Sequence, residues 1–151
     1  MNLELKELIS INFDIDPINI QQLVGYCNLN YKVTTSTDQY ILKTYENIHL
    51  LENLLQESSV LLQLHAKGNS TTKYPRPIKM TTGEYVKILE IDGKKIIIRL
   101  LAYIPGDLLN DVVKTPALMK EVGKSMAELL NLLKDVEFKD LANPYWKIEN
   151  Y

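Results

Sequence analysis

Cysteine is almost absent from this sequence of 151 residues, which contains only Cys27. A lone thiol cannot form a disulfide within the chain and fits a reducing compartment better than an oxidising one. We therefore expect a cytoplasmic protein whose fold rests on packing. Internal repeats and low-complexity tracts are absent as well. With 46% hydrophobic residues, the chain is long and apolar enough to bury one core or two small ones.

An excess of charge of one sign is also lacking. The 17 Lys and Arg residues are nearly balanced by 19 Asp and Glu residues, so no basic surface for nucleic acid is expected. The longest apolar run, around residues 96–103, has about half of the roughly 20 residues that a membrane-spanning helix needs. Acidic residues interrupt the N-terminal turns, unlike those of a secretory signal or transit peptide. We expect neither a nucleic acid nor a membrane as partner.

The hydrophobic spacing predicts an α+β fold, a mainly antiparallel sheet with one inserted helix. Helical spacing, a cap at Gly68 and the start signal Thr115-Pro116 predict three helices, over residues 3–12, 48–67 and 116–135. Alternating apolar residues and turn signals predict strands near residues 18–24, 29–33, 40–45, 78–80, 84–91 and 94–103. Asp92-Gly93 is the strongest hairpin signal, because such a tight turn needs positive φ.

Two charged residues lie where apolar ones are expected. Lys43 is in the middle of a predicted strand and shares a face with Ile41 and Tyr45. Glu57 interrupts a stripe of leucines along residues 50–64. A carboxylate on a buried face needs a partner, and Lys43 is the simplest one. The alternative, which periodicity alone favours, is a surface lysine and a solvated glutamate.

Residues 25–30 form a turn-rich connection between two strands. Its backbone N–H groups could point at a ligand, and its turn residues are Gly25, Asn28 and Asn30. It has one glycine where a phosphate-binding loop has three, so an ordinary hairpin turn is the alternative. His49 and His65 fall in a predicted helix, where solvated or partly packed side chains are expected. No cluster has metal-ligand spacing.

The order of these pieces resembles the amino-terminal lobe of the protein-kinase-like small-molecule phosphotransferases. That family includes aminoglycoside phosphotransferases, choline kinases and homoserine kinases. The shared order is a Gly/Asn loop, a strand with a lysine, a helix with a glutamate, a hairpin, and a strand ending in a Pro-Gly break. The matching segments are residues 25–33, 40–43, 56–64, 75–77 and 99–106. Residues 103–109 and 145–151 look most similar to hydroxylysine-kinase-like proteins.

The resemblance implies that residues 1–106 are a nucleotide-binding lobe with its hinge, and that residues 107–151 begin a helical lobe. It assigns Lys43 to the α- and β-phosphates of ATP and Glu57 to the ion pair that holds this lysine. The loop residues expected at the nucleotide are Gly25, Asn28 and Asn30. Phosphoryl transfer mainly requires positioned phosphates and screened charge, which a cation in a shaped slot supplies.

The same resemblance implies the residues that hold the base. Val33 and Ile41 would form an apolar ceiling over the adenine, and Leu101 would stand at the back of its pocket. The carbonyl of Ala102 and the N–H of Ile104 would bind the adenine edge. These two contacts use the backbone, so they place little demand on the side chains.

One half of the family's site is missing from these residues. The catalytic base and the metal-binding acid of the family lie in His-Gly-Asp and Asp motifs beyond the hinge, and neither His49 nor His65 is followed by Gly-Asp. Leu130 stands where many relatives have a histidine. We therefore expect no catalytic or metal-binding residue in this chain, magnesium ligands outside it, and no activity from it alone.

The expected function is the ATP-binding portion of a kinase that phosphorylates a hydroxyl of an amino alcohol, amino acid or aminoglycoside-like substrate. The alternative is a non-catalytic nucleotide-binding or protein-interaction module. The apolar stripe on the helix over residues 116–135 needs a cover. We expect it to dock on the sheet or, preferably, to pair with a second copy as a homodimer.

Overall fold

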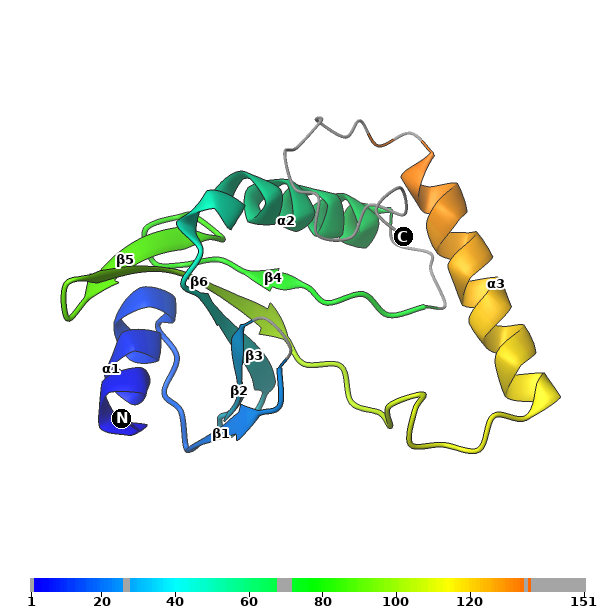
Figure 1. Cartoon of the computed structure of the whole chain (residues 1–151), viewed down its shortest axis with the longest axis horizontal. Coiled ribbons are helices and arrows are strands. Elements are labelled where there is room, and N and C mark those ends of the chain that lie inside the picture. The colour runs from blue at the N-terminus through cyan, green and yellow to red at the C-terminus, as the bar shows by residue number, and fades with distance from the viewer. Residues whose placement is uncertain (1, 26–27, 68–71, 135, 137–151) are drawn as a thin grey trace.

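The computed structural model describes residues 2–25, 28–67, 72–134 and 136. Six strands form one sheet in the order β1-β2-β3-β6-β4, and β5 also pairs with β6 (Figure 1). Their bounds are β1 Asn19–Leu23, β2 Leu29–Thr34, β3 Gln39–Tyr45, β4 Pro77–Ile78, β5 Lys87–Ile91 and β6 Lys94–Ala102. Every pairing is antiparallel, which confirms the predicted fold class.

Three α-helices lie in the predicted segments. Helix α1 spans Asn2–Phe13, and α2 spans Leu51–Ala66 after a short 3₁₀ turn, η1, at Ile48–Leu50. Helix α3 spans Pro116–Leu133, with the Thr115 side chain accepting a hydrogen bond from the N–H of Leu118. Helices α1 and α2 lie on opposite sides of the sheet, and α3 stands apart from it (Figure 1). The predicted cap at Gly68 lies outside the described residues.

Tight turns fix the ends of β5. Asp92 and Gly93 have φ of 51° and 73°, as the hairpin signal predicts, since both central residues of such a turn need positive φ. At the other end, Gly83 has φ of 103°, and the Met80 N–H donates to the Glu84 carbonyl. This turn occupies the start of the strand predicted over 84–91, so β5 begins only at Lys87.

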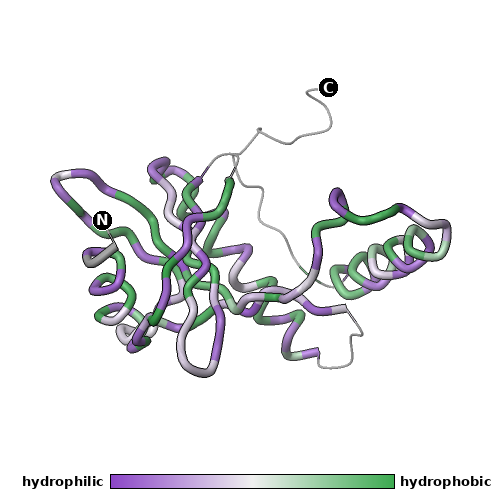
Figure 2. The backbone as a smooth tube through the Cα atoms, turned by 90° about the horizontal axis from the view of Figure 1, so that it is seen from below, coloured by the Kyte–Doolittle hydropathy of each residue, from purple (hydrophilic) through white to green (hydrophobic). Residues whose placement is uncertain are grey.

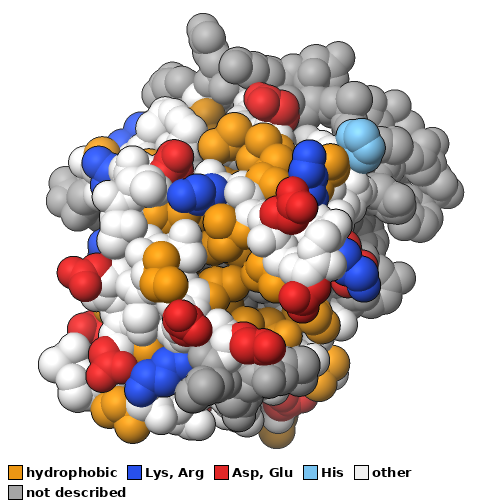
Figure 3. Space-filling model, turned by 90° about the vertical axis from the view of Figure 1, so that its left-hand side faces the viewer, with side chains coloured by type: hydrophobic (Ala, Val, Ile, Leu, Met, Phe, Trp, Pro, Cys, Tyr) orange, Lys and Arg blue, Asp and Glu red, His pale blue; other side chains and the backbone are white. Residues whose placement is uncertain are grey.

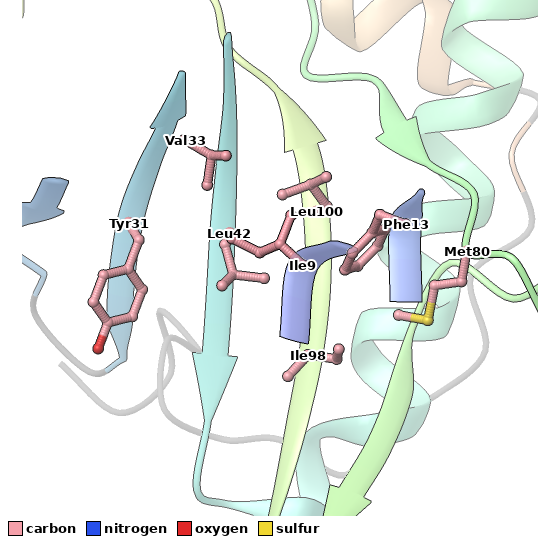
Figure 4. Close-up of a cluster of buried hydrophobic side chains, with 8 residues drawn as sticks. All are labelled: Ile9, Phe13, Tyr31, Val33, Leu42, Met80, Ile98 and Leu100. Carbon is pink, nitrogen blue, oxygen red and sulfur yellow. The ribbon is translucent and has the colours of Figure 1, made fainter. Parts of the chain in front are cut away.

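The main core lies between α1 and the sheet. Ile9 and Phe13 of α1 face strand residues that include Leu42, and the cluster is closed by Met80 (Figure 4). Its members are Ile9, Phe13, Tyr31, Val33, Leu42, Met80, Ile98 and Leu100, each no more than 6% exposed. Because strand side chains alternate, these residues bury one face of β2, β3 and β6 and leave the other to α2.

A second, smaller core lies under α2. It contains Tyr45, Leu54, Val86 and Ile97. Helix α3, in contrast, has no buried residue, although apolar residues recur along it (Figure 2). Hydrogen bonds tie it to neighbouring segments: the Lys67 ammonium donates to the Leu132 carbonyl, and the Thr72 hydroxyl donates to the Glu128 carboxylate, each at 2.7 Å. Over the described ranges, no helix is long and apolar enough to cross a membrane.

Candidate nucleotide site

Strand register places two rows of side chains on the α2 face of the sheet. Residues directly opposite each other in antiparallel strands share a face. One set of successive partners, here called the polar row, is Asn30, Lys43 and Arg99. The next set towards the hinge, here called the hinge row, is Lys32, Ile41, Leu101 and Pro77. The sheet therefore offers charged donors beside an apolar surface, as a nucleotide requires.

Arg99 is the centre of the polar row, and it is only 3% exposed. Its Nε–H donates to the Tyr45 hydroxyl at 3.0 Å. Its Nη2 lies 3.0 Å from both Glu57 oxygens, Oε1 and Oε2. Its Nη1 is buried and has no hydrogen-bond partner. The guanidinium therefore connects β3 and α2 and still carries unused donors.

Glu57 does not form the predicted ion pair with Lys43 in the described part of the chain; it pairs with Arg99 instead. An arginine offers a planar set of donors that meets both carboxylate oxygens, whereas a lysine offers one ammonium. Arg99 is not among the predicted site residues, because it lies within the apolar run around residues 96–103. The available signal was its position as the single charge among the apolar residues from 96 to 102.

Lys43 stands beside Arg99 on the same face and has no hydrogen-bond or ion-pair partner among the described residues. Burial, and then the neighbouring Arg99 charge, hold the pKa of Lys43 below its usual range, and Glu57 opposes them. Among the described residues, the two neighbouring cations thus face one carboxylate, which pairs with Arg99. The polar row carries a surplus positive charge that an anion would neutralise.

The loop before β2 closes the end of the polar row. A Cβ atom on Gly25 would lie 2.3 Å from the Asn28 carbonyl oxygen and 2.5 Å from Asn30 Nδ2, so only glycine fits this close approach. Among the described residues, Asn30 Oδ1 is buried without a hydrogen-bond partner. The structure brings these loop residues together with Lys43; Tyr26 and Cys27 lie outside the described residues.

Val33, expected above the adenine together with Ile41, lies on the other face of the sheet. Ile41 and Leu101 are opposite each other on the α2 face, but Val33 is fully buried in the α1 core on the other face. The β2 residue opposite Ile41 is Lys32, one position earlier. The Lys32 Nζ lies 4.1 Å from the centre of the Tyr103 ring, a cation–π contact at the hinge end of the row.

Two backbone hydrogen bonds fix the hinge. The Ala102 N–H donates to the Arg76 carbonyl at 2.8 Å, and the Tyr103 N–H donates to the Gln39 carbonyl at 3.0 Å. The Ile104 N–H has no partner among the described residues. A hollow beside the hinge is lined by Ala102, Tyr103 and Ile104 together with residues from α2 and the 72–76 link. The hinge backbone is thus held in place next to open space.

Other polar residues have structural surroundings. His49 is exposed, and His65 Nε2 lies 3.0 Å from the Tyr74 carbonyl oxygen, a contact that ties α2 to the following link. Within the described ranges, no group of three or more His, Cys, Asp and Glu residues could hold a metal ion.

A separate hollow opens at the end of the molecule that carries the β5–β6 hairpin. Figure 3 shows apolar side chains gathered at the centre of this face. The apolar residues that line the hollow are Leu5, Leu8, Leu29, Leu50, Ile91 and Ile96. Neither Lys43 nor Arg99 lines it, but Gly25, Asn28 and Tyr45 do, so the hollow adjoins the loop end of the polar row.

Comparisons with known proteins show the family and the fold. The model of the phosphotransferase enzyme family, APH, matches residues 20–150. Hydroxylysine kinase from Xenopus laevis is 26% identical, over 85% of this chain and 37% of that protein. The chain thus spans well under half of this relative.

Three solved structures share the fold. The amicoumacin kinase hAmiN, in complex with AMP-PNP, Ca²⁺ and Ami, has a TM-score of 0.68 and 20% identity, over 92% of this chain and 41% of that one. Spectinomycin phosphotransferase APH(9)-Ia, with ADP and spectinomycin, has a TM-score of 0.60 and 18% identity, over 91% and 38%. A microcompartment-associated aminopropanol kinase has a TM-score of 0.74 and 16% identity, over 99% and 46%. Since the family model covers most of the chain, this protein belongs to the phosphotransferase enzyme family.

Proposed function

We propose that residues 1–106 are the ATP-binding part of a small-molecule kinase. The observation that carries the proposal is the polar row, in which Lys43 lies without an ion-pair partner among the described residues, beside the Arg99–Glu57 pair and a glycine-bearing loop. Lys43, held beside a second cation and without an ion-pair partner among the described residues, makes a site for an anionic group such as a phosphate. The structural relatives crystallised with AMP-PNP and ADP support a nucleotide as that anion.

In this proposal the polar row binds the phosphates of the nucleotide, and the hinge row binds its adenine. The Lys43 ammonium binds the α- and β-phosphates. Ile41 and Leu101 contact the adenine, and the Ala102 carbonyl and Ile104 N–H bind its edge. Gly25, Asn28 and Asn30 of the loop lie near the phosphates, where Gly25 permits the close approach of the backbone. Magnesium, when bound, would screen charge on the phosphates, and we expect its ligands outside this chain.

The acceptor is proposed from the relatives' names. They act on hydroxylysine, spectinomycin, amicoumacin or aminopropanol, so we propose a hydroxyl of an amino alcohol, amino acid or aminoglycoside-like compound. The chain's own residues bind and orient the nucleotide. They supply no His-Gly-Asp base, so we expect this chain alone to bind nucleotide weakly and to transfer no phosphate.

Titration of the 151-residue chain with ADP, followed by NMR, tests the nucleotide site. Lys43→Met should weaken binding about tenfold or more, because a charge-assisted contact to phosphate is lost. Lys79→Met, at an exposed lysine after β4, is the matched control and should bind as the wild type does. Equal ADP affinities for Lys43→Met and the wild type would contradict the proposal.

A further inference from the structure

A lysine on β2 and a tyrosine of the hinge meet on the α2 face of the sheet. The Lys32 Nζ lies 4.1 Å from the centre of the Tyr103 ring. Lys32 belongs to β2 and Tyr103 follows β6, and strand β3 lies between these two strands in the sheet. Neighbouring strands are about 4.8 Å apart, so the contact spans roughly 10 Å of sheet. The two side chains, here called the Lys32–Tyr103 bridge, therefore cross β3.

Strand register shows where the bridge crosses. Lys32 is opposite Ile41, and Ile41 is opposite Leu101, so the bridge begins within the hinge row. It ends at Tyr103, whose backbone N–H donates to the Gln39 carbonyl at 3.0 Å, at the start of β3. The bridge therefore borders the apolar surface of Ile41 and Leu101 on its hinge side.

The bridge directs the Lys32 ammonium away from the polar row. Residues two apart on a strand are separated by about 7 Å, and Lys32 follows Asn30 of the polar row at this spacing. From there its side chain reaches Tyr103, at the far end of the hinge row. Among the described residues, no carboxylate forms an ion pair with Lys32. An aromatic ring at the base end of the site thus holds this cation, and Lys43 is the ammonium at the phosphate end.

We propose that the Lys32–Tyr103 bridge forms the hinge-side wall of the nucleobase site, and that Lys32 takes the place over the base that was expected for Val33. This inference rests on the proposed nucleotide-binding function. The apolar stem of Lys32 contacts the base beside Ile41, while its ammonium stays on the Tyr103 ring. Both side chains of the bridge are half-buried, which leaves part of each for a ligand. Tyr103 is a positioning residue, because it holds the stem over the hinge row and acts on the nucleotide through Lys32.

Substitutions at Lys32 separate the contributions of its stem and its charge. Lys32→Met keeps an apolar stem without the charge, so the ADP affinity should fall about threefold, the size of one exposed cation–π contact. Lys32→Ala also removes the stem and should lower the affinity about tenfold. Lys79→Met is again the matched control and should bind ADP as the wild type does. Equal ADP affinities for Lys32→Ala and the wild type would overturn the inference.

A double substitution tests whether the charge of Lys32 acts through Tyr103. Tyr103→Leu removes the ring, so its ADP affinity should also fall about threefold. The double variant Lys32→Met/Tyr103→Leu should bind within about twofold of either single variant, because the same contact is lost only once. Losses that multiply in the double variant would overturn the inference.

Adenosine, which has no phosphate, separates the base end of the site from the phosphate end. Lys32→Met should weaken the binding of adenosine and of ADP by the same factor, because the bridge borders the base. An adenosine affinity that is unchanged in Lys32→Met would overturn the inference, since Lys32 would then act on the phosphates. A wild-type chain that binds ADP and not adenosine would overturn it as well.

NMR of the chain labelled with ¹³C at the lysine Cε atoms detects the bridge without nucleotide. A group over the face of an aromatic ring is shielded, so the Lys32 signal, assigned from its absence in Lys32→Arg, should lie upfield of the other lysine signals. Tyr103→Leu should return it to their position. A Lys32 signal with no upfield shift, or one that Tyr103→Leu leaves in place, would overturn the inference even if ADP binds. A wild-type chain with the shifted signal that binds no ADP would instead contradict the proposed function, and the inference with it.

Discussion

The two faces of one sheet differ sharply in this protein, although the same strands supply both. On the α1 face, Leu42 and Leu100 are fully buried among apolar neighbours. At the adjacent position of each strand, on the α2 face, Lys43 and Arg99 lie opposite each other, and Arg99 pairs with the Glu57 carboxylate. We propose that the period-two alternation of β3 and β6 separates stability from nucleotide binding, so that each can be changed on its own face.

Substitutions at the neighbouring positions 41 and 42 of β3 should affect different properties, ADP binding at one and stability at the other. Leu42→Ala should cost about 3 kcal/mol of unfolding free energy, because it leaves a cavity in a closed core. Ile41→Ala, on the partly exposed hinge row, should cost about 1 kcal/mol but weaken ADP binding. Urea unfolding and ADP titration of both variants measure the pair of effects. Equal losses of unfolding free energy at the two positions would contradict the difference between the two faces of the sheet.

The protonated Lys43 side chain should lower the free energy of unfolding. Burial and Arg99 lower its pKa, so the protonated lysine costs folding energy below that lowered pKa, and the cost fades as pH rises towards the unfolded value near 10.5. Lys43→Met keeps the apolar stem and removes the charge. It should therefore unfold at higher urea than the wild type at pH 7, by a margin that shrinks at alkaline pH. A margin that grows with pH would contradict this sign.

Local signals predicted the elements of the fold well. The alternation over 40–45, the Asp92-Gly93 turn and the Thr115-Pro116 start each depend on a few adjacent residues, and the structure contains all three. Such features follow from backbone preferences that the sequence states directly.

The site was predicted less completely, because it depends on lateral register. Lys32, and not Val33, lies opposite Ile41, since a shift of one residue moves a whole strand's side chains to the other face. Likewise, the choice of Glu57 between Lys43 and Arg99 depends on how α2 sits across β3 and β6. Hydrophobic periodicity within one segment contains neither piece of information.

A substitution at Gly25, where the loop backbone approaches Asn28 closely, tests the role of the loop on the α2 face. Gly25→Ala places a methyl group 2.3 Å from the Asn28 carbonyl oxygen, so the loop must move. We expect a loss of about 1 kcal/mol of stability and a severalfold loss of ADP affinity. Gly123→Ala is the matched control, because nothing lies within 4 Å of its Cβ position in α3. It should stabilise the helix slightly and leave ADP binding unchanged; equal ADP losses in both variants would contradict the role of the loop.

The smallest expected effect concerns α3, whose apolar stripe we still expect to pair with a second copy. Val122→Glu puts a charge on the stripe and should reduce the average mass measured by light scattering at micromolar concentration. Asn131→Glu adds the same charge at an exposed position on the opposite side of the helix and should change nothing. A wild-type chain that stays monomeric at every concentration would rule out the homodimer.

Methyl NMR during an ADP titration tests the division between the two faces most directly, because methyl signals report side chains on each face separately. The account predicts that the methyl signals of Ile41 and Leu101 shift with added ADP, while those of Val33, Leu42 and Leu100 stay in place. Shifts confined to Val33, Leu42 and Leu100, or equal shifts on both faces, would contradict it.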